Sequence, residues 1–167
     1  DTMLISLRGQ GMLKRRLLNG DGKQRRGGMG VYDIKLKDDD APAFLLPALA
    51  SETLVVVTTR CRTFRVPVNT LRLGDVRDRG DSLAERLRLT EGEKIGAVLA
   101  VNDANESDRP WVLLGAAKGV VRRLRRNVLG PNLADGPLFF RPQVCGAPPA
   151  RCLTPVPYNK LPPPRTV

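Results

Sequence analysis

Three stretches of the sequence repeat one pattern of short apolar runs. Residues 52–66 align with residues 1–15 at an offset of 51 positions, and residues 109–123 align with them at an offset of 108, which places Gly119 on Gly11. In each stretch two apolar runs flank a few turn residues, a pattern typical of a β-hairpin. A repeat of about 50–57 residues built from short strands has the length of one propeller blade. The sequence therefore predicts an all-β fold of antiparallel blades.

The second halves of the first two repeats also align. Arg26 falls on Arg79 and Gly27 on Gly80, whereas the third repeat contains only its opening hairpin. We therefore predict about two and a half blades in a propeller-like domain over residues 1–129. The predicted blades are residues 1–50, 51–102 and 103–129.

Individual strands are predicted where apolar residues run together or alternate with polar ones. The segment 83–90 fits either a strand or a short helix. Trp111 aligns with Met3 and Leu54, which predicts that its side chain lies in the core. The predicted strands are residues 3–7, 12–18, 31–37, 53–59, 63–68, 94–101, 111–117 and 120–129.

The composition changes near residue 130. Residues 127–167 hold ten of the 14 prolines and a single acid, Asp135. Proline removes a backbone donor, so this stretch cannot form a regular ladder. We predict that residues 130–167 form an extended tail that lies against neighbouring proteins or nucleic acid, because it cannot bury enough apolar surface by itself.

The charge of the chain indicates a polyanionic partner. It has 28 Lys and Arg against 17 Asp and Glu, a net charge of +11 and a pI near 10.4, which is typical of nucleic-acid-binding domains. The sequence contains no histidine, so the commonest general base and metal ligand is missing. Its three cysteines form no CxxC pair and predict neither a zinc site nor a disulfide framework. We predict no catalytic residue, no metal and no cofactor.

Residues 24–30, which we call the box, read QRRGGMG. Glycines let a backbone approach a phosphate closely, and successive N–H groups can form a concave anion site. Arginine side chains add charge-assisted hydrogen bonds to phosphate oxygens. Two further basic runs, KRR and VRRLRR, mark the surfaces of two other segments. The predicted nucleic-acid-binding residues are Gln24, Arg25, Arg26, Gly27, Gly28, Gly30, Lys14, Arg15, Arg16, Lys23, Arg122, Arg123, Arg125 and Arg126.

The box resembles that of the DNA gyrase A C-terminal domain, whose usual form is Gln-Arg-Arg-Gly-Gly-(Lys/Arg)-Gly. Six of the seven positions match, and Met29 replaces the usual base. The segments around the box are similar to the first blades of that domain over residues 1–129. The resemblance implies a six-bladed, propeller-like disc whose basic rim wraps DNA. It also implies a non-catalytic accessory part of a type II DNA topoisomerase, because the tyrosine that cuts DNA lies in a different part of gyrase A.

Two functions remain open at this point. The first is a DNA-wrapping module that contacts duplex phosphates without sequence specificity. The second is a structural subunit of a large ribonucleoprotein, such as a bacterial or organellar ribosome, that binds RNA and neighbouring proteins. The missing blades, the long tail and Met29 favour the second, and the rest of the box favours the first. Both imply an intracellular protein of the bacterial cytoplasm, nucleoid, mitochondrion or plastid. No apolar run approaches the ~18 residues of a membrane span.

Overall fold

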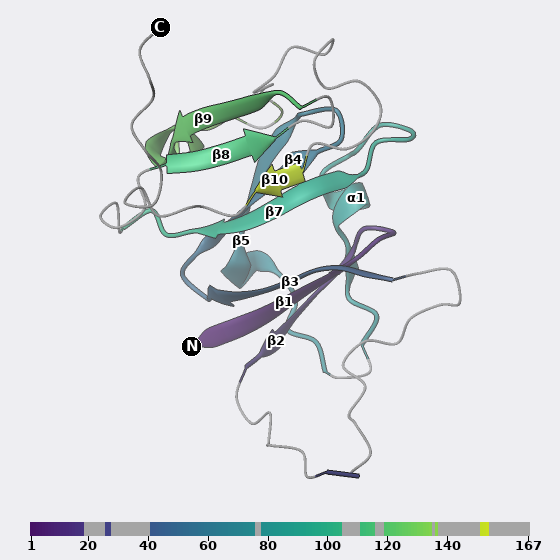
Figure 1. The fold of residues 1–167 in the computed structure, drawn as a ribbon. Coiled ribbons are helices and arrows are strands. Elements are labelled where there is room, and N and C mark those ends of the chain that lie inside the picture. The colour runs from purple at the N-terminus through teal and green to yellow at the C-terminus, as the bar shows by residue number, and fades with distance from the viewer. Residues whose placement is uncertain are drawn as a thin grey trace, which may run out of the picture. The chain divides into compact units, whose positions relative to one another are not determined.

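The computed structural model describes residues 1–18, 26–27, 41–75, 78–104, 111–115, 119–134, 136 and 151–153. These residues fold almost entirely into antiparallel strands, with one α-helix of four residues among them (Figure 1). The predicted all-β fold is therefore confirmed. The elements are β1 (Thr2–Arg8), β2 (Met12–Leu17), β3 (Pro42–Leu49), β4 (Thr53–Thr58), β5 (Thr63–Pro67), the 3-10 helix η1 (Val68–Thr70), β6 (Asp81–Ser82), α1 (Leu83–Arg86), β7 (Ile95–Val101), β8 (Trp111–Gly115), β9 (Val121–Arg125), the 3-10 helix η2 (Arg126–Leu129) and β10 (Arg151–Leu153).

The chain divides into two compact units, and each is discontinuous in sequence. Unit 1 comprises Asp1–Glu52 and Pro67–Gly92, and unit 2 comprises Thr53–Val66 and Glu93–Val167. Unit 1 contains a four-stranded sheet in the order β3-β1-β2-β6. Unit 2 contains two three-stranded sheets, in the orders β5-β4-β7 and β10-β8-β9. Each unit thus takes its strands from two separated stretches of the chain.

The sheet of unit 1 is built around β1. Alternate side chains Met3, Ile5 and Leu7 are buried on one face, where Leu7 pairs with the buried Leu13 of β2. The outer strand β3 pairs antiparallel with β1, with a register shift between Leu7 and Arg8. Sequence reasoning did not predict β3, because its two prolines argue against a strand; an edge position tolerates them. The predicted strand at 31–37 lies outside the described residues.

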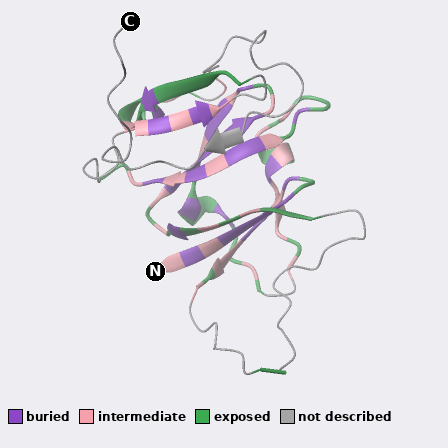
Figure 2. Cartoon of the chain, in the orientation of Figure 1, coloured by how far each residue is buried: buried purple, intermediate pink, exposed green. Residues whose placement is uncertain are grey.

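Strand β4 organises unit 2. All six of its residues are buried, and it pairs with β7 from Thr53–Val101 to Thr58–Ile95 (Figure 2). Val55 and Val57 belong to an apolar cluster that we call the unit 2 core. Its other members are Cys61, Ala97, Leu99, Val101, Val112, Leu114, Leu124 and Leu129, with Leu133 packed against it.

The hairpin turns correct the register of the predicted repeat. Gly11 and Cys61 both have positive φ (84° and 60°), and each donates its N–H to the carbonyl three residues earlier, at 2.9 and 2.8 Å. Equivalent positions of the first two hairpins are thus 50 residues apart, not 51. A buried strand such as β4 does not alternate in polarity, so apolar matching alone could not fix its register. In the third hairpin, Gly119 occupies the equivalent place with φ 81°, as predicted.

The ambiguous segment 83–90 begins with a helix. Ser82 caps α1 by accepting a hydrogen bond from the backbone N–H of Glu85 at 3.3 Å, which is typical of a serine N-cap. Leu83 is the buried residue of this turn. The preceding strand β6 pairs with β2 and completes the sheet of unit 1. No helix among the described residues is long and apolar enough to span a membrane.

Candidate nucleic-acid interface

Strand β9 presents a row of arginines at the edge of its sheet. Arg122, Arg123 and Arg125, which we call the β9 strip, are exposed, whereas Leu124 between them is buried in the unit 2 core (Figure 2). Among the described strands, β9 lies at the edge of its sheet, in the order β10-β8-β9. Among the described residues, no acid forms an ion pair with Arg123 or Arg125. The strip therefore concentrates positive charge on one short, accessible strand.

The prediction that Trp111 is a core residue is wrong. Its ring is half-buried, and the guanidinium carbons of Arg123 and Arg125 lie 4.3 and 5.4 Å from the ring centroid. The ladder explains this arrangement, because Trp111 pairs with Arg125 and Leu113 with Arg123, which puts these side chains on one face. Cation–π contact of this kind orients a guanidinium group without neutralising it. Trp111 thus supports the strip from the neighbouring strand.

The structure describes only two residues of the box. Arg26 and Gly27 are exposed in a turn, and Gly27 has φ 84°. The other predicted residues of this region lie outside the described residues: Lys23, Gln24, Arg25, Gly28 and Gly30. In the next repeat, Gly80 also has a positive φ of 80°, in agreement with the predicted alignment of Gly27 and Gly80. A Cβ at Gly80 would lie 2.8 Å from the carbonyl carbon of Leu13, so this turn packs directly on β2.

The basic run of β2 is less accessible than the β9 strip. Lys14 is 4% exposed, while Arg15 and Arg16 are half-buried and donate to the carbonyls of Val68 (2.7 Å) and Leu17 (3.1 Å). In the sheet, β2 lies between β1 and β6, and β6 pairs with it only at Met12 and Leu13. Because Lys14 is buried, we leave it out of the set of proposed phosphate contacts.

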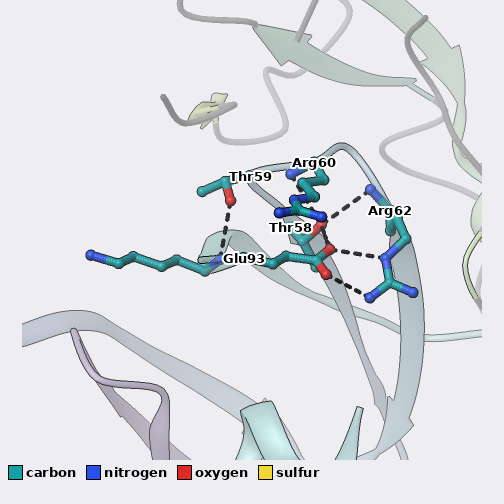
Figure 3. Close-up of polar contacts among 6 residues, drawn as sticks. Thr58, Thr59, Arg60, Arg62 and Glu93 are labelled. Carbon is teal, nitrogen blue, oxygen red and sulfur yellow. Dashed lines mark hydrogen bonds and ion pairs between the residues drawn. The ribbon is translucent and has the colours of Figure 1, made fainter. Parts of the chain in front are cut away.

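A buried ion pair that sequence reasoning missed holds the β4–β5 hairpin (Figure 3). The Glu93 carboxylate, whose side chain has no exposed surface, accepts from Arg62 Nε at 2.9 Å and Nη2 at 2.6 Å. The Thr58 hydroxyl also donates to Glu93, at 2.5 Å. Hydrogen bonding to this carboxylate is the main reason that the pKa of Arg62 is raised. No local motif signals the contact, because 31 residues separate its two charged partners.

The second hairpin also carries a cystine that the sequence did not predict. Cys61 is fully buried in the unit 2 core and is disulfide-bonded. A positive φ normally favours glycine, and the other two hairpins have Gly11 and Gly119 at the equivalent position. Cys61 occupies that position in the second hairpin. Cysteine spacing could not reveal the bond, since the three cysteines are scattered along the chain.

Another polar cluster lies at the turn that precedes β6. Arg72 contacts the carboxylates of Asp78 (2.7 Å) and Asp81 (3.4 Å) on the surface of unit 1. The pKa of Asp78 is lowered, chiefly because it accepts a hydrogen bond from the Gly80 N–H and also because of the Arg72 charge. The described residues contain no group of three or more acidic or cysteine side chains that could hold a metal ion.

The amino-acid sequence of this chain was compared with those of known proteins. No protein-family model matches the chain. The DNA gyrase A protein of Haemophilus influenzae is 31% identical over 124 residues, which is 74% of this chain and 14% of that protein. Its counterpart from Aeromonas salmonicida is 27% identical over 136 residues, or 81% of this chain and 14% of that protein. The sequence relatives of this chain are DNA gyrase A proteins.

Solved structures agree with the gyrase A relationship at the level of the fold. The C-terminal domain of E. coli ParC matches with a TM-score of 0.59 and 18% identity, covering 81% of this chain and 49% of that domain. The DNA gyrase A C-terminal domain matches with a TM-score of 0.57 and 20% identity, covering 74% of this chain and 39% of that chain. The predicted resemblance to the gyrase A C-terminal domain is therefore confirmed, over part of that domain. The chain spans about one seventh of the length of the two gyrase A proteins above.

Proposed function

We propose that this chain is a DNA-binding module that contacts duplex phosphates through exposed arginines. The β9 strip carries the proposal, because it places three exposed guanidinium groups on one short strand, and guanidinium groups form charge-assisted hydrogen bonds with phosphate oxygens. The relationship to DNA gyrase A supports DNA as the nucleic acid. We extend the proposal to the box, whose described residues Arg26 and Gly27 are exposed.

Binding of this kind does not depend on base sequence. Reading bases in the major groove requires an inserted helix or two-stranded ribbon with side chains directed at base edges. The only α-helix among the described residues has four residues and follows its Ser82 cap directly. Affinity should therefore come from counterion release and fall steeply as salt rises.

The first test is the double substitution Arg123→Gln with Arg125→Gln, two arginines on the same face of β9. We expect weaker binding to a duplex of arbitrary sequence, and a log–log salt slope that is shallower by about 1.8, because each phosphate contact contributes about 0.9. Fluorescence anisotropy at several salt concentrations measures both quantities. The charge-retaining pair Arg123→Lys with Arg125→Lys is the control and should keep the slope. If the glutamine pair left the slope unchanged, the strip would not contact DNA.

The second test addresses the box. Replacing Arg25 and Arg26 together with alanine should weaken binding and lower the slope by up to two contacts, or about 1.4–1.8 units over single-stranded and duplex ligands. If the strip and the box act independently, combining both pairs should add their changes in slope. An affinity and slope equal to those of the unaltered chain would show that the box does not contact the nucleic acid.

The proposal assigns no catalytic residue and no cofactor to this chain. The ribonucleoprotein alternative depends mainly on residues 131–167, most of which lie outside the described residues, and no described contact favours it. The same assay separates the two functions, with an RNA duplex of identical sequence in place of DNA. A large preference for RNA would favour the alternative, since 2′-hydroxyl contacts distinguish the two nucleic acids.

A further inference from the structure

Unit 2 contains an open hollow beside the β9 strip. Its volume is about 430 Å³, within the range of small-ligand sites. The polar residues that line it come from the turn after β7, from the last residue of β9 and from the segment that follows β9: Asn102, Asp103, Arg125, Arg126, Asn127 and Asn132. A bare phosphate would not fill this volume, whereas a phosphate with its sugar or base fits.

The charge of the hollow is positive because its acid is already paired. Asp103 Oδ2 lies 2.5 Å from Arg65 Nη2, and Arg65 also donates to the carbonyl of Leu129. The Arg65 side chain is only 12% exposed, so this guanidinium group is used to bind Asp103 and the Leu129 carbonyl, two groups of the lining. Arg125 and Arg126 form no ion pair with any described residue, so both positive charges remain to meet an anion.

Arg125 and the rim of the hollow are held in place before a ligand arrives. The Trp111 ring lies 5.4 Å from the guanidinium carbon of Arg125 and limits its orientation. Gly130 closes a turn by donating its N–H to the Asn127 carbonyl at 3.0 Å, and its own carbonyl accepts from Leu133. A Cβ at Gly130 would lie 2.9 Å from the Asn127 oxygen, so the turn leaves no space for a side chain. A site formed in advance costs less ordering on binding.

We propose that this hollow binds the phosphoryl group of a nucleotide, with Arg125 and Arg126 as its cationic ligands. The asparagines supply amide donors and acceptors suited to a sugar hydroxyl or a base edge. The choice of a nucleotide rests on the proposed function, but the site is distinct from the box. The phosphoryl group belongs either to a nucleic-acid strand or to a free nucleotide.

The experiment titrates the full chain with dAMP, inorganic phosphate and deoxyadenosine. Fluorescence of Trp111, the only tryptophan, reports on Arg125 beside it, and calorimetry gives the affinity. We expect dAMP and phosphate to compete for one site, and deoxyadenosine to bind at least tenfold more weakly than dAMP. Equal binding of deoxyadenosine and dAMP would overturn the phosphoryl site.

Two variants with equal loss of charge locate the site. Arg126→Gln should weaken dAMP binding about tenfold, the usual effect of losing one charge-assisted hydrogen bond. Arg79→Gln removes an exposed arginine of unit 1, remote in sequence from the hollow, and should leave dAMP binding unchanged. Arg126→Lys keeps the charge and should restore part of the affinity. Equal losses in Arg126→Gln and Arg79→Gln would overturn the proposal.

Duplex DNA identifies the source of the phosphoryl group. Displacement of dAMP by DNA assigns the hollow to a strand, and simultaneous binding assigns it to a free nucleotide; both results support the site. If the chain bound dAMP but no DNA, the proposed function would fail and the hollow would stand. If it bound DNA but neither dAMP nor phosphate, the hollow would fail and the proposed function would stand.

Discussion

Replacing Arg62 with alanine should lower the free energy of unfolding by about 3 kcal/mol. The change removes the guanidinium group that donates two hydrogen bonds to the Glu93 carboxylate, whose side chain has no exposed surface. Breaking a buried pair in this way costs roughly 3–5 kcal/mol. We expect the lower end of that range, because the Arg62 side chain is 27% exposed and water already screens part of the interaction. Urea unfolding followed by circular dichroism measures the loss.

The matched control is Arg72→Ala. Arg72 also contacts carboxylates, those of Asp78 and Asp81, but its side chain is 59% exposed. Pairs of that kind contribute about 0–1 kcal/mol, so this variant should unfold at nearly the same urea concentration as the unaltered chain. Similar losses for the two alanine variants would show that burial of Glu93 does not set the strength of its pair.

Gly80→Ala should destabilise the chain by about 2–5 kcal/mol. Two effects combine here: a φ of 80° costs a residue with a Cβ roughly 1–2 kcal/mol, and the new methyl group would overlap the Leu13 carbonyl, which adds about 1–3 kcal/mol of overpacking. The neighbouring backbone cannot easily move aside, because the buried Arg8 side chain donates to the Arg79 carbonyl at 2.7 Å.

Gly92→Ala separates the two effects. Gly92 has a similar φ of 74°, but no atom lies within 4 Å of a Cβ placed there, so only the conformational cost of about 1–2 kcal/mol applies. Thermal unfolding of the two variants gives the difference directly. If both lost the same stability, the contact between the Gly80 turn and β2 would contribute nothing.

The parts of the fold that the sequence predicted are those with local signals. The β1–β2 and β8–β9 hairpins have two apolar runs around a glycine of positive φ, and the structure has both. Strand β3 lacks such a signal, since Pro42 and Pro47 are acceptable only because the strand is at an edge. Edge or interior position is a property of the whole sheet, so it could not be read from the segment.

In the candidate interface, too, features with a local sequence signal were predicted and features that depend on contacts between strands were not. The exposed arginines of β9 were predicted from their density, because charges so close together are costly to bury. The stacking of two of them on Trp111 depends on the strand register, and the pairing of Arg62 with Glu93 depends on a contact between distant segments. Lys14 was predicted as a binding cation from its basic run, but its side chain is buried, and nothing in the run itself signals that burial.

The discontinuous make-up of the two units affects how a newly synthesised chain can fold. As the chain leaves the ribosome, β1 and β2 form a hairpin early, but β6, which pairs with β2, emerges only after β4 and β5 of the other unit. Strand β4 must in turn wait for β7, and long-range pairing of this kind slows folding. During that interval its TLVVVT sequence, which contains neither charge nor proline, is unpaired with β7 and can associate with other chains. Synthesis of this protein therefore includes a stage in which β4, whose six residues are all buried in the folded chain, is exposed and able to aggregate.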